Sequence, residues 1–272
     1  MTDGPVLTKG GKGLGCVRMW ERDSRAKKFP AHVLIGSGST PSKSDMTGLI
    51  FVPPGFTHPD QENLQECVGW SLCGSIYVRQ KAMGLKPVEP SPGAIYYQAR
   101  ARAYGWRNIW DGGCNPNEAW QALKERGVVL YNDWPHDPKS VNKAFPSAYR
   151  KAADHRWLQY HWVLRNGSAR TKEGTGLLGS KRPLSVALTI DQGMEDWRPG
   201  MAPWKRTGPI VGGHAVLIVG HETLANGQVV FVYCNSWGKA WGDNGFGLLS
   251  QEAFESPETS YIATPDIDGR LV

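Results

Sequence analysis

The chain has 272 residues, enough for one large domain or for two small lobes around a cleft. Hydrophobic residues make up 40% and charged residues 21%, which is ordinary for a globular protein, and no run of about 18 apolar residues predicts a membrane span. The net charge of +6 comes from scattered Lys and Arg side chains rather than from a basic run. We therefore expect a solvated basic surface, with neither a specific nucleic-acid partner nor a membrane partner.

Residues 1–45 are rich in Gly, Lys, Ser and Pro, a composition typical of an extended or partly ordered arm. Within this arm, residues 31–35 predict a short strand. We rank a docking tail that joins a larger assembly, or a linker, above a shortened pro-segment. The N-terminus has no apolar signal region, so we expect a cytoplasmic protein or one carried in a phage particle.

Residues 46–160 are predicted to form a helical lobe that opens with a strand over residues 48–54. Capping residues and apolar periodicity predict its helices over residues 67–83, 91–100, 117–126 and about 147–158. Ser91 is placed as an N-cap, with Pro92 at the first helical position after it.

Residues 161–272 are predicted to form a β-rich lobe. Runs of β-branched and apolar residues predict its strands over residues 183–190, 214–220, 228–234 and 245–250. The dipeptide Asn226-Gly227 is typical of a hairpin turn between the second and third of these strands. A Gly-rich loop is expected over residues 173–180, and the chain is expected to end in a polar tail.

Cys67 stands where a polar loop meets the central helix. A thiol at a helix N-terminus lies near the positive end of the helix dipole and near unpaired backbone N–H groups. Both favour the thiolate, so we expect a lowered pKa and a nucleophilic sulfur. The side-chain amide of Gln61 and the backbone N–H of Cys67 are candidate donors to an oxyanion.

A thiolate nucleophile needs a base, and the base needs a group that orients it. His214 opens an apolar, β-rich run after two glycines, and Asn235 begins the block Asn-Ser-Trp-Gly. We expect Asn235 to hold the imidazole ring of His214 while Trp237 shields that hydrogen bond from water.

The chain order Gln61, Cys67, His214 and Asn235, with the NSWG block and a WGDNGFG block after it, resembles the papain-like cysteine peptidases. The 147 residues from Cys67 to His214 fall within the family's range of about 130–150 residues. The resemblance implies an α+β fold of two lobes with the active-site cleft between them. It implies a cysteine endopeptidase that cleaves polypeptides through a thioester acyl-enzyme, with those four residues as catalytic groups and without a metal or organic cofactor.

The resemblance also suggests substrate-binding residues. In that family, a Gly-containing loop before the third helix supplies backbone hydrogen bonds to an extended peptide substrate. Gly112 and Gly113 occupy that place, so they are candidate substrate-binding residues. Trp237 of the NSWG block is a third candidate. The alternative for the two glycines is that they only make a turn.

The chain departs from the papain signature next to the nucleophile. A Cys three residues before it and an aromatic residue after it are replaced by Leu64 and Val68, so the family's nearby disulfide is not expected. This looser pattern resembles bacterial and phage-type relatives. Cys73 is a rival nucleophile, but it falls inside the helix. The five cysteines show no zinc-type spacing and indicate a reducing compartment.

Two other functions stay open at this point. A peptidoglycan-cleaving amidase or endopeptidase would use the same Cys–His chemistry, and the basic, Trp-rich composition suits it. A structural or docking component, for example of a phage particle, would keep the papain-like fold without needing turnover.

Overall fold

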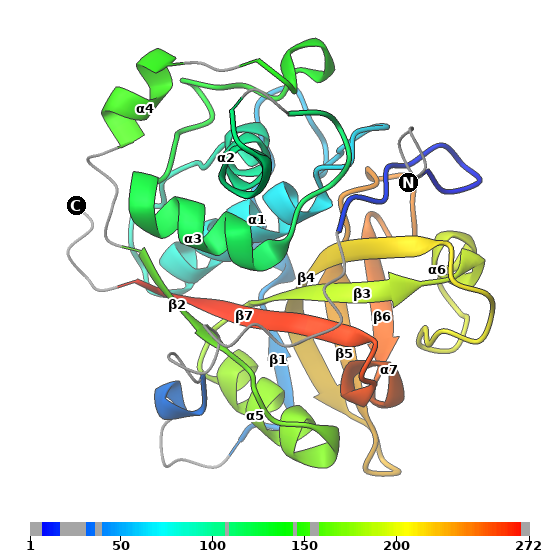
Figure 1. Ribbon diagram of the computed structural model, residues 1–272. Coiled ribbons are helices and arrows are strands. Elements are labelled where there is room, and N and C mark those ends of the chain that lie inside the picture. Colours follow the sequence, from blue (N-terminus) through cyan, green and yellow to red (C-terminus); the bar gives the residue numbers. More distant parts are fainter. Residues whose placement is uncertain are drawn as a thin grey trace.

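The computed structural model describes residues 7–16, 31–35, 40–106, 109–143, 146–152 and 158–267. Helices of the first half are α1 (Cys67–Ala82), α2 (Pro92–Tyr104), α3 (Pro116–Arg126) and α4 (Pro146–Ala152), which gather at the top of Figure 1. Ser91 caps α2 by accepting a hydrogen bond from the Ala94 N–H, and Asn115 caps α3 through the Asn117 N–H. Gly127 follows the end of α3 with a positive φ of 85°. The first three predicted helices are therefore confirmed.

One antiparallel sheet dominates the second half of the described chain. Its strands are β1 (Lys43–Asp45), β2 (Leu158–Trp162), β3 (Leu184–Ile190), β4 (Gly212–Thr223), β5 (Val229–Cys234), β6 (Phe246–Ser250) and β7 (Thr259–Ile267). The strand order is β2-β7-β3-β4-β5-β6, with β1 paired to β4. A hairpin closed by Leu224 and Gln228 joins β4 to β5 at the predicted Asn226-Gly227 turn. The four predicted strands are confirmed.

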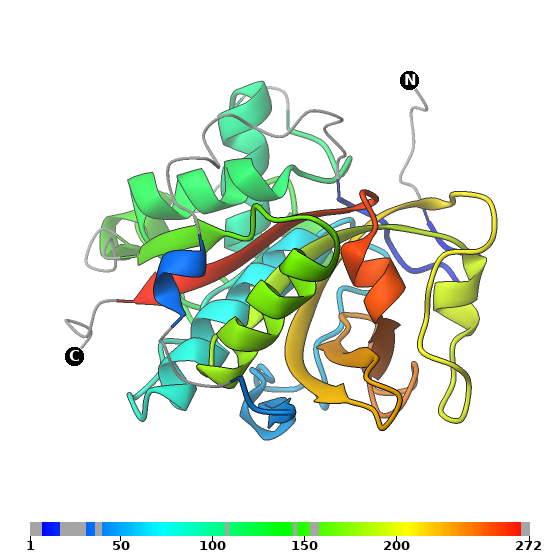
Figure 2. The same ribbon diagram turned by 90° about the horizontal axis from the view of Figure 1, so that it is seen from below.

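Helices cover both faces of this sheet, as Figure 2 shows from below. Alternate residues of β3 point to opposite faces. Ser185 bonds to α1, while Leu184 lies beside α5 (Gly167–Gly179). Helix α1 also packs on α2 and α3, so it lies between the helical lobe and the sheet. The shorter helices α6 (Gln192–Asp196) and α7 (Gln251–Glu255) follow β3 and β6. The two-lobed α+β fold is confirmed.

Two predicted loops are in fact regular structure. The segment over residues 173–180 lies mostly within α5, because its glycines serve close packing rather than a turn: a Cβ at Gly174 would come within 2.8 Å of the Phe254 ring, and one at Gly176 within 3.1 Å of Ile35. The polar tail was also wrongly predicted up to Ile267. Strand β7 pairs with β2 and β3, and its Ile262 and Ala263 are buried.

Two predicted strands are wrong. Residues 31–34 form a 3₁₀ helix, η2 (Ala31–Leu34), and a second, η3 (Thr47–Leu49), opens the segment expected as a strand over 48–54. A short apolar run does not itself distinguish strand from helix or irregular chain. The end of the predicted arm instead supplies β1, whereas residues 17–30 and 36–39 lie outside the described residues, as do 153–157 of the expected fourth helix.

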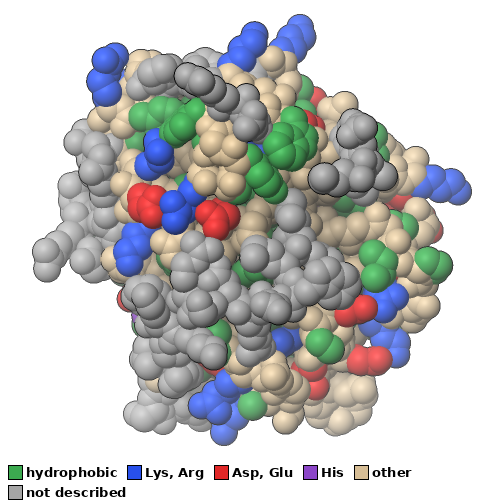
Figure 3. All heavy atoms as spheres, viewed as in Figure 1, with side chains coloured by type: hydrophobic (Ala, Val, Ile, Leu, Met, Phe, Trp, Pro, Cys, Tyr) green, Lys and Arg blue, Asp and Glu red, His purple; other side chains and the backbone are tan. Residues whose placement is uncertain are grey.

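Lys and Arg side chains are scattered over the face drawn in Figure 3 instead of forming one patch. Among the described helices, none combines the length and apolar character that a membrane span requires.

Candidate active site

The loop that carries Gln61 is fixed to the end of β5. Gln61 is fully buried, and its N–H donates to the Ser236 carbonyl at 2.9 Å. The Ser236 hydroxyl donates in turn to Gln61 Oε1 at 2.6 Å. Gln61 Nε2 donates to the Leu64 carbonyl at 2.6 Å, three residues before Cys67 begins α1, which leaves its second N–H for another acceptor.

His214 and Asn235 are brought together as the sequence predicted. Asn235 Oδ1 lies 2.8 Å from His214 Nε2, and the indole of Trp237 stacks on the imidazole with 4.5 Å between ring centroids. Both His214 and Asn235 are buried. His214 Nδ1 is also buried and has no hydrogen-bond partner among the described residues. An orphaned buried nitrogen is costly, so its presence calls for a functional explanation.

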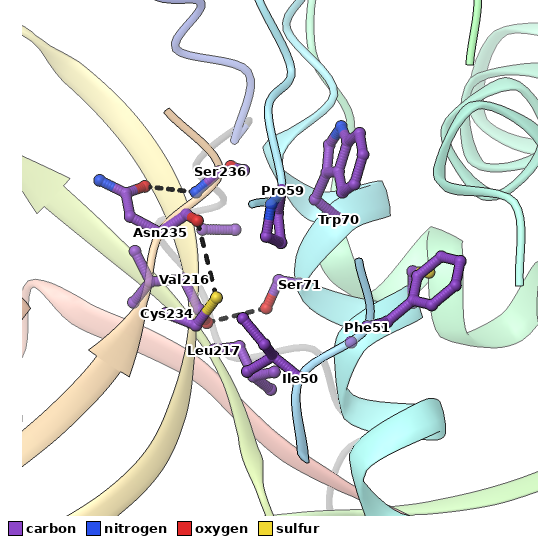
Figure 4. A pocket seen from close by; sticks show the side chains of 13 residues that line it. Ile50, Phe51, Pro59, Trp70, Ser71, Val216, Leu217, Cys234, Asn235 and Ser236 are labelled. Carbon is purple, nitrogen blue, oxygen red and sulfur yellow. Dashed lines mark hydrogen bonds between the residues drawn. The ribbon is translucent and has the colours of Figure 1, made fainter. Parts of the chain in front are cut away.

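Ser71 fixes the helix that carries Cys67 against the strand that carries His214 (Figure 4). Its hydroxyl donates to the Val216 carbonyl of β4 at 2.8 Å and lies 2.8 Å from Ser185 Oγ of β3. Cys67 lies one helical turn before Ser71, and His214 lies two strand residues before Val216. Both steps span roughly 6 Å, so they bring Cys67 level with His214. The Ala215 N–H, next to His214, hydrogen-bonds the Cys67 thiol.

A segment of the N-terminal arm, residues 7–16, lies across this site; we call it the cleft segment. Gln61 Nε2, the predicted oxyanion donor, donates to the Gly13 carbonyl at 3.0 Å. The backbone of Gly15 hydrogen-bonds the Cys67 thiol. As a result Cys67 is fully buried.

Backbone hydrogen bonds join the cleft segment to both walls. Toward the helical lobe, the Cys114 N–H donates to the Gly15 carbonyl at 2.7 Å. Toward the sheet, the Cys16 N–H donates to the Gly213 carbonyl at 3.1 Å, one residue before His214. The segment therefore bridges the helical lobe and the sheet beside Cys67 and His214.

Glycines make this close approach possible. A Cβ at Gly13 would lie 2.0 Å from the Leu64 carbonyl oxygen, and a Cβ at Gly15 would lie 1.7 Å from the Gln65 carbonyl oxygen. Both neighbours are backbone atoms that cannot swing aside as a side chain would. Neither position can take a larger residue while the segment stays in the cleft.

Polar side-chain contacts hold the start of the cleft segment against the rest of the protein. Its Thr8 hydroxyl donates to Glu195 of α6 at 2.6 Å, and Lys12 forms a 2.9 Å ion pair with Asp60. The Lys12–Asp60 pair is partly exposed, and such pairs contribute about 0–1 kcal/mol. The buried backbone contacts of Gly13 and Gly15 therefore matter more.

The electrostatics of the covered site reverse our expectation for Cys67. Burial raises the pKa of its thiol to about 11, although the N–H groups of Gly15 and Ala215 favour the thiolate. Burial likewise lowers the pKa of His214 to about 4, against the opposing effect of Asn235. The helix N-terminus does not offset desolvation here, so in the covered state both groups are neutral at pH 7.

The two candidate substrate-binding glycines differ. Gly113, with φ of +79°, touches the cleft segment: a Cβ there would lie 2.3 Å from the Gly15 carbonyl oxygen. Gly112 packs instead against its own neighbour Trp110, and its N–H donates to the Trp110 carbonyl at 3.0 Å.

A second buried cysteine, Cys234, lies beside a different histidine ring. Cys234 Sγ is 3.5 Å from His58 Nε2, but the same nitrogen lies 3.0 Å from the Asn235 carbonyl oxygen. Burial raises the pKa of Cys234 and lowers that of His58. Cys234 also lines a small cavity of about 20 Å³ between α1 and the sheet (Figure 4). The other rival, Cys73, is buried in α1 and donates to the Pro90 carbonyl at 3.0 Å.

Sequence reasoning missed a buried charge beside the nucleophile. Glu66, the residue before Cys67, lies 2.6 Å from His136 Nδ1, and both side chains are buried. Its carboxylate also accepts a 2.7 Å hydrogen bond from the Trp70 indole. Burial would lower the pKa of His136, but the hydrogen bond and charge of Glu66 outweigh it and raise the pKa. The spacing of His136, 70 residues away, gave no signal of this pair.

Within the described residues, no three His, Cys, Asp or Glu side chains are grouped so as to hold a metal ion.

Comparison with known sequences points to one family. The model of the papain family cysteine proteases matches residues 108–263, which include His214 and Asn235 but not Cys67. A cathepsin L-like proteinase of Fasciola hepatica is 27% identical over 187 residues, covering 69% of this chain and 54% of that protein. The oryzain gamma chain of Oryza sativa subsp. japonica is 26% identical over 197 residues, covering 69% and 49%. The chain thus spans about half the length of these relatives.

Comparison with solved structures gives the same fold over nearly the whole chain. Xylellain, a cysteine protease from Xylella fastidiosa, superposes with a TM-score of 0.75 at 19% identity and covers 98% of this chain and 99% of its own. Digestive procathepsin L 3 from the larval midgut of Tenebrio molitor gives a TM-score of 0.65 at 15% identity, covering 93% and 76%. Unlike the family match, these alignments extend through the N-terminal half that carries Cys67.

Proposed function

The chain belongs to the papain family of cysteine proteases, and from that premise we propose that it is an endopeptidase whose nucleophile is Cys67. The orphaned Nδ1 of His214 carries this assignment. Asn235 occupies the other ring nitrogen, so Nδ1 is the nitrogen left to exchange a proton with a thiol. Ser71 sets Cys67 level with that ring.

The proposed reaction begins with the thiolate of Cys67 and the imidazolium of His214, formed once the site is uncovered. The sulfur attacks the peptide carbonyl carbon, and Gln61 Nε2 and the Cys67 N–H donate to the oxyanion. Loss of one such donor typically costs about 2.7–4 kcal/mol of transition-state stabilisation. His214 protonates the leaving amine, which leaves a thioester on Cys67. His214 then takes a proton from water, the hydroxide attacks the thioester, and the carboxylic acid leaves as the thiolate reforms.

Asn235 and Trp237 position the base in this scheme. The Asn235 amide fixes the imidazole orientation through a 2.8 Å hydrogen bond, and the stacked indole of Trp237 keeps water from that bond. Gly113 is proposed to bind the substrate backbone, because its neighbour Cys114 already binds the cleft segment in this way. Gly112 supports that loop through its contact with Trp110.

The described structure corresponds to a closed form of this enzyme. The cleft segment occupies the Gln61 donor and buries Cys67, so it must leave before a substrate can bind. Procathepsin L 3 and a ragweed pollen cysteine protease in its proform are among the proteins of similar fold. This supports a pro-segment role for residues 7–16, which we had ranked below a docking tail.

Cleavage of two substrates tests the proposal. Reduced protein, with the segment opened by Gly15→Ala, is incubated with an unfolded protein and with purified peptidoglycan, and a Gly15→Ala/His214→Ala variant is the control. We expect protein cleavage that the control loses. Solubilised peptidoglycan without protein cleavage would favour the amidase alternative, and no turnover of either would favour a structural component.

The bacterial type of the protein, its location and a docking role for the arm are further proposals. The fold similarity to xylellain supports a bacterial-type member of the family. A polypeptide substrate follows from family membership, whereas residence in the cytoplasm or in a phage particle, and docking to an assembly through the arm, rest on the sequence alone.

A further inference from the structure

Two cysteines face each other across the edge of the closed cleft. Cys16 of the cleft segment and Cys114, in the loop before α3, are direct partners in a parallel β-bridge. Neighbouring strands lie about 4.8 Å apart, which falls within the Cα separation of about 4.4–6.8 Å found in disulfides. Partners in such a bridge project their side chains to the same face. Both residues carry thiols in the structure.

The surroundings hold this pair in register. The Cys114 N–H donates to the Gly15 carbonyl at 2.7 Å, and the Cys16 N–H donates to the Gly213 carbonyl at 3.1 Å. Both side chains belong to the apolar cluster that includes Cys67. Cys16 retains 8% of its exposure, while Cys114 retains 1%, so a soluble reagent reaches Cys16 first.

The catalytic cysteine lies near this pair but has other backbone partners. The Cys67 thiol is hydrogen-bonded by the backbone of Gly15 and Ala215. Burial and, after it, the charge of Cys67 raise the pKa of Cys114, whereas the β-bridge joins Cys114 to Cys16. A bond between the bridge partners Cys16 and Cys114 would leave the Cys67 thiol chemically intact beneath the cleft segment, whereas a bond from Cys114 to Cys67 would consume it.

We propose that Cys16 and Cys114 form a reversible disulfide that locks the cleft segment over the active site. The oxidant is a small disulfide such as glutathione disulfide. The Cys16 thiolate attacks it and releases one small thiol. The Cys114 thiolate then attacks the Cys16 sulfur and releases the second, so two protein thiols lose two electrons while one small disulfide becomes two thiols. A reductant reverses both steps. The consequence for activity rests on the proposed function.

The first experiment tests the bond without the catalytic thiol. The full chain with Cys67→Ser is equilibrated in glutathione buffers of increasing oxidised fraction, quenched with acid, alkylated and mapped by mass spectrometry without reduction. We expect a peptide pair joined through Cys16 and Cys114. A Cys73→Ser change in the same background should leave that pair intact, because Cys73 bonds to Pro90 elsewhere in α1. Cys16 found only as a glutathione adduct, or joined to another cysteine, would overturn the proposal.

Thermal unfolding of the same samples gives a readout independent of activity. The disulfide closes a loop of about 100 residues, so oxidation should raise the unfolding midpoint by on the order of 5–10 °C. The rise should disappear in Cys16→Ser and in Cys114→Ser, each made in the Cys67→Ser background. A rise of equal size in either variant would contradict the lock.

The second experiment measures closure in the protein with Cys67. Oxidised protein is passed through a desalting column and labelled with an epoxysuccinyl thiol-protease probe before and after reduction. We expect oxidation to slow labelling at Cys67 at least tenfold, with full recovery on reduction. Equal labelling in both states, with the mapped disulfide present, would sink the locking role. If the fully reduced Gly15→Ala protein is never labelled at Cys67, the proposed function fails, whereas the disulfide stands on the mapping and unfolding data.

Discussion

Two buried histidine rings, His58 and His214, lie in regions that also hold a buried cysteine, and the two rings differ in their hydrogen-bond partners. His58 presents its Nε2 to both the Cys234 sulfur and the Asn235 carbonyl oxygen. His214 has Nε2 held by the Asn235 amide and leaves Nδ1 without a partner among the described residues. Cys234 ends a strand, whereas Cys67 begins a helix. The His58 ring nitrogen near Cys234 is thus already engaged by a carbonyl, whereas the His214 ring keeps a nitrogen available for the proton transfer that we propose.

The cleft segment also lies beside only one of these two cysteines. Its backbone meets Gln61 and Cys67 at Gly13 and Gly15, in the place that we propose for a peptide substrate. Cys234 instead lines a small cavity between α1 and the sheet. We therefore infer the nucleophile from its access to a peptide backbone and to an oxyanion donor, and we give these more weight than the 3.5 Å distance from Cys234 to an imidazole.

The largest expected difference in activity is between the variants that replace the Cys67 sulfur and the Cys234 sulfur. Cys67→Ser should lower kcat/KM for an unfolded protein at least ~10⁴-fold, because the hydroxyl is not ionised by the neighbouring base. Cys234→Ser should stay within about threefold of the parent. Both are measured in the Gly15→Ala background, under reducing conditions. The reverse ranking would transfer the nucleophile to Cys234.

Removing Asn235, which orients the His214 imidazole, should give a smaller loss of activity. Asn235→Ala deletes one hydrogen bond to an imidazole that becomes charged during turnover, a bond of about 1.5–3 kcal/mol, so kcat should fall roughly 10–150-fold. Asn235→Ala keeps the backbone carbonyl that His58 contacts, and His58→Gln serves as the matched change at the other ring. A larger kcat loss for His58→Gln than for Asn235→Ala would break the comparison.

Opening the cleft should raise the reactivity of Cys67 alone. Gly15→Ala places a Cβ 1.7 Å from the Gln65 carbonyl oxygen, and overpacking of this kind costs about 1–3 kcal/mol, so probe labelling at Cys67 should rise roughly tenfold or more. Gly48→Ala, where a Cβ meets nothing within 4 Å, is the control.

The pH dependence of alkylation sharpens that prediction. In the covered form the Cys67 pKa of about 11 means that the rate falls about tenfold for each pH unit below it. Uncovering should lower this pKa, so the Gly15→Ala rate should level off at lower pH. Coincident pH profiles would contradict burial as the cause.

The smallest effect on chemistry is expected from the Glu66–His136 pair. His136→Gln leaves the Glu66 carboxylate buried without its charged partner, which should lower the free energy of unfolding by about 3–5 kcal/mol near pH 6. The raised pKa of His136 means that its contribution is complete below about pH 6.5 and is lost as pH rises through the folded value. Urea unfolding of both proteins at pH 6 and pH 9 measures this, and an equal difference at both values would exclude the ion pair as the cause.

Local signals in the sequence predicted most of the fold. Ser91 and Asn115 are side-chain caps with nearby prolines, and the predicted strands carry apolar β-branched runs, so helices and strands followed from neighbours in the chain. The loop predicted over residues 173–180 was wrong, because Gly174 and Gly176 serve close contact with Phe254 and Ile35, which are distant in sequence. Contacts of that kind leave no local pattern.

For the site, too, local sequence signals predicted some features, while others depend on contacts between residues distant in the sequence. The order Gln61, Cys67, His214 and Asn235 was visible, and the structure brings the last two within hydrogen-bond distance. The raised pKa of Cys67 was not visible, because it depends on a segment about 50 residues away that covers the thiol. In the sequence, Gly13 and Gly15 match the Gly-rich composition of the arm, and their close approach to the backbone of Leu64 and Gln65 depends on the folded structure.

Site mapping of the epoxysuccinyl probe tests the central assignment most directly. Reduced Gly15→Ala protein and its His214→Ala derivative are labelled side by side, and the modified residue is located by mass spectrometry. We expect rapid labelling at Cys67 that the His214→Ala change abolishes. Labelling at Cys234, or equal slow labelling of both proteins, would contradict the assignment of Cys67 and His214 as the catalytic pair.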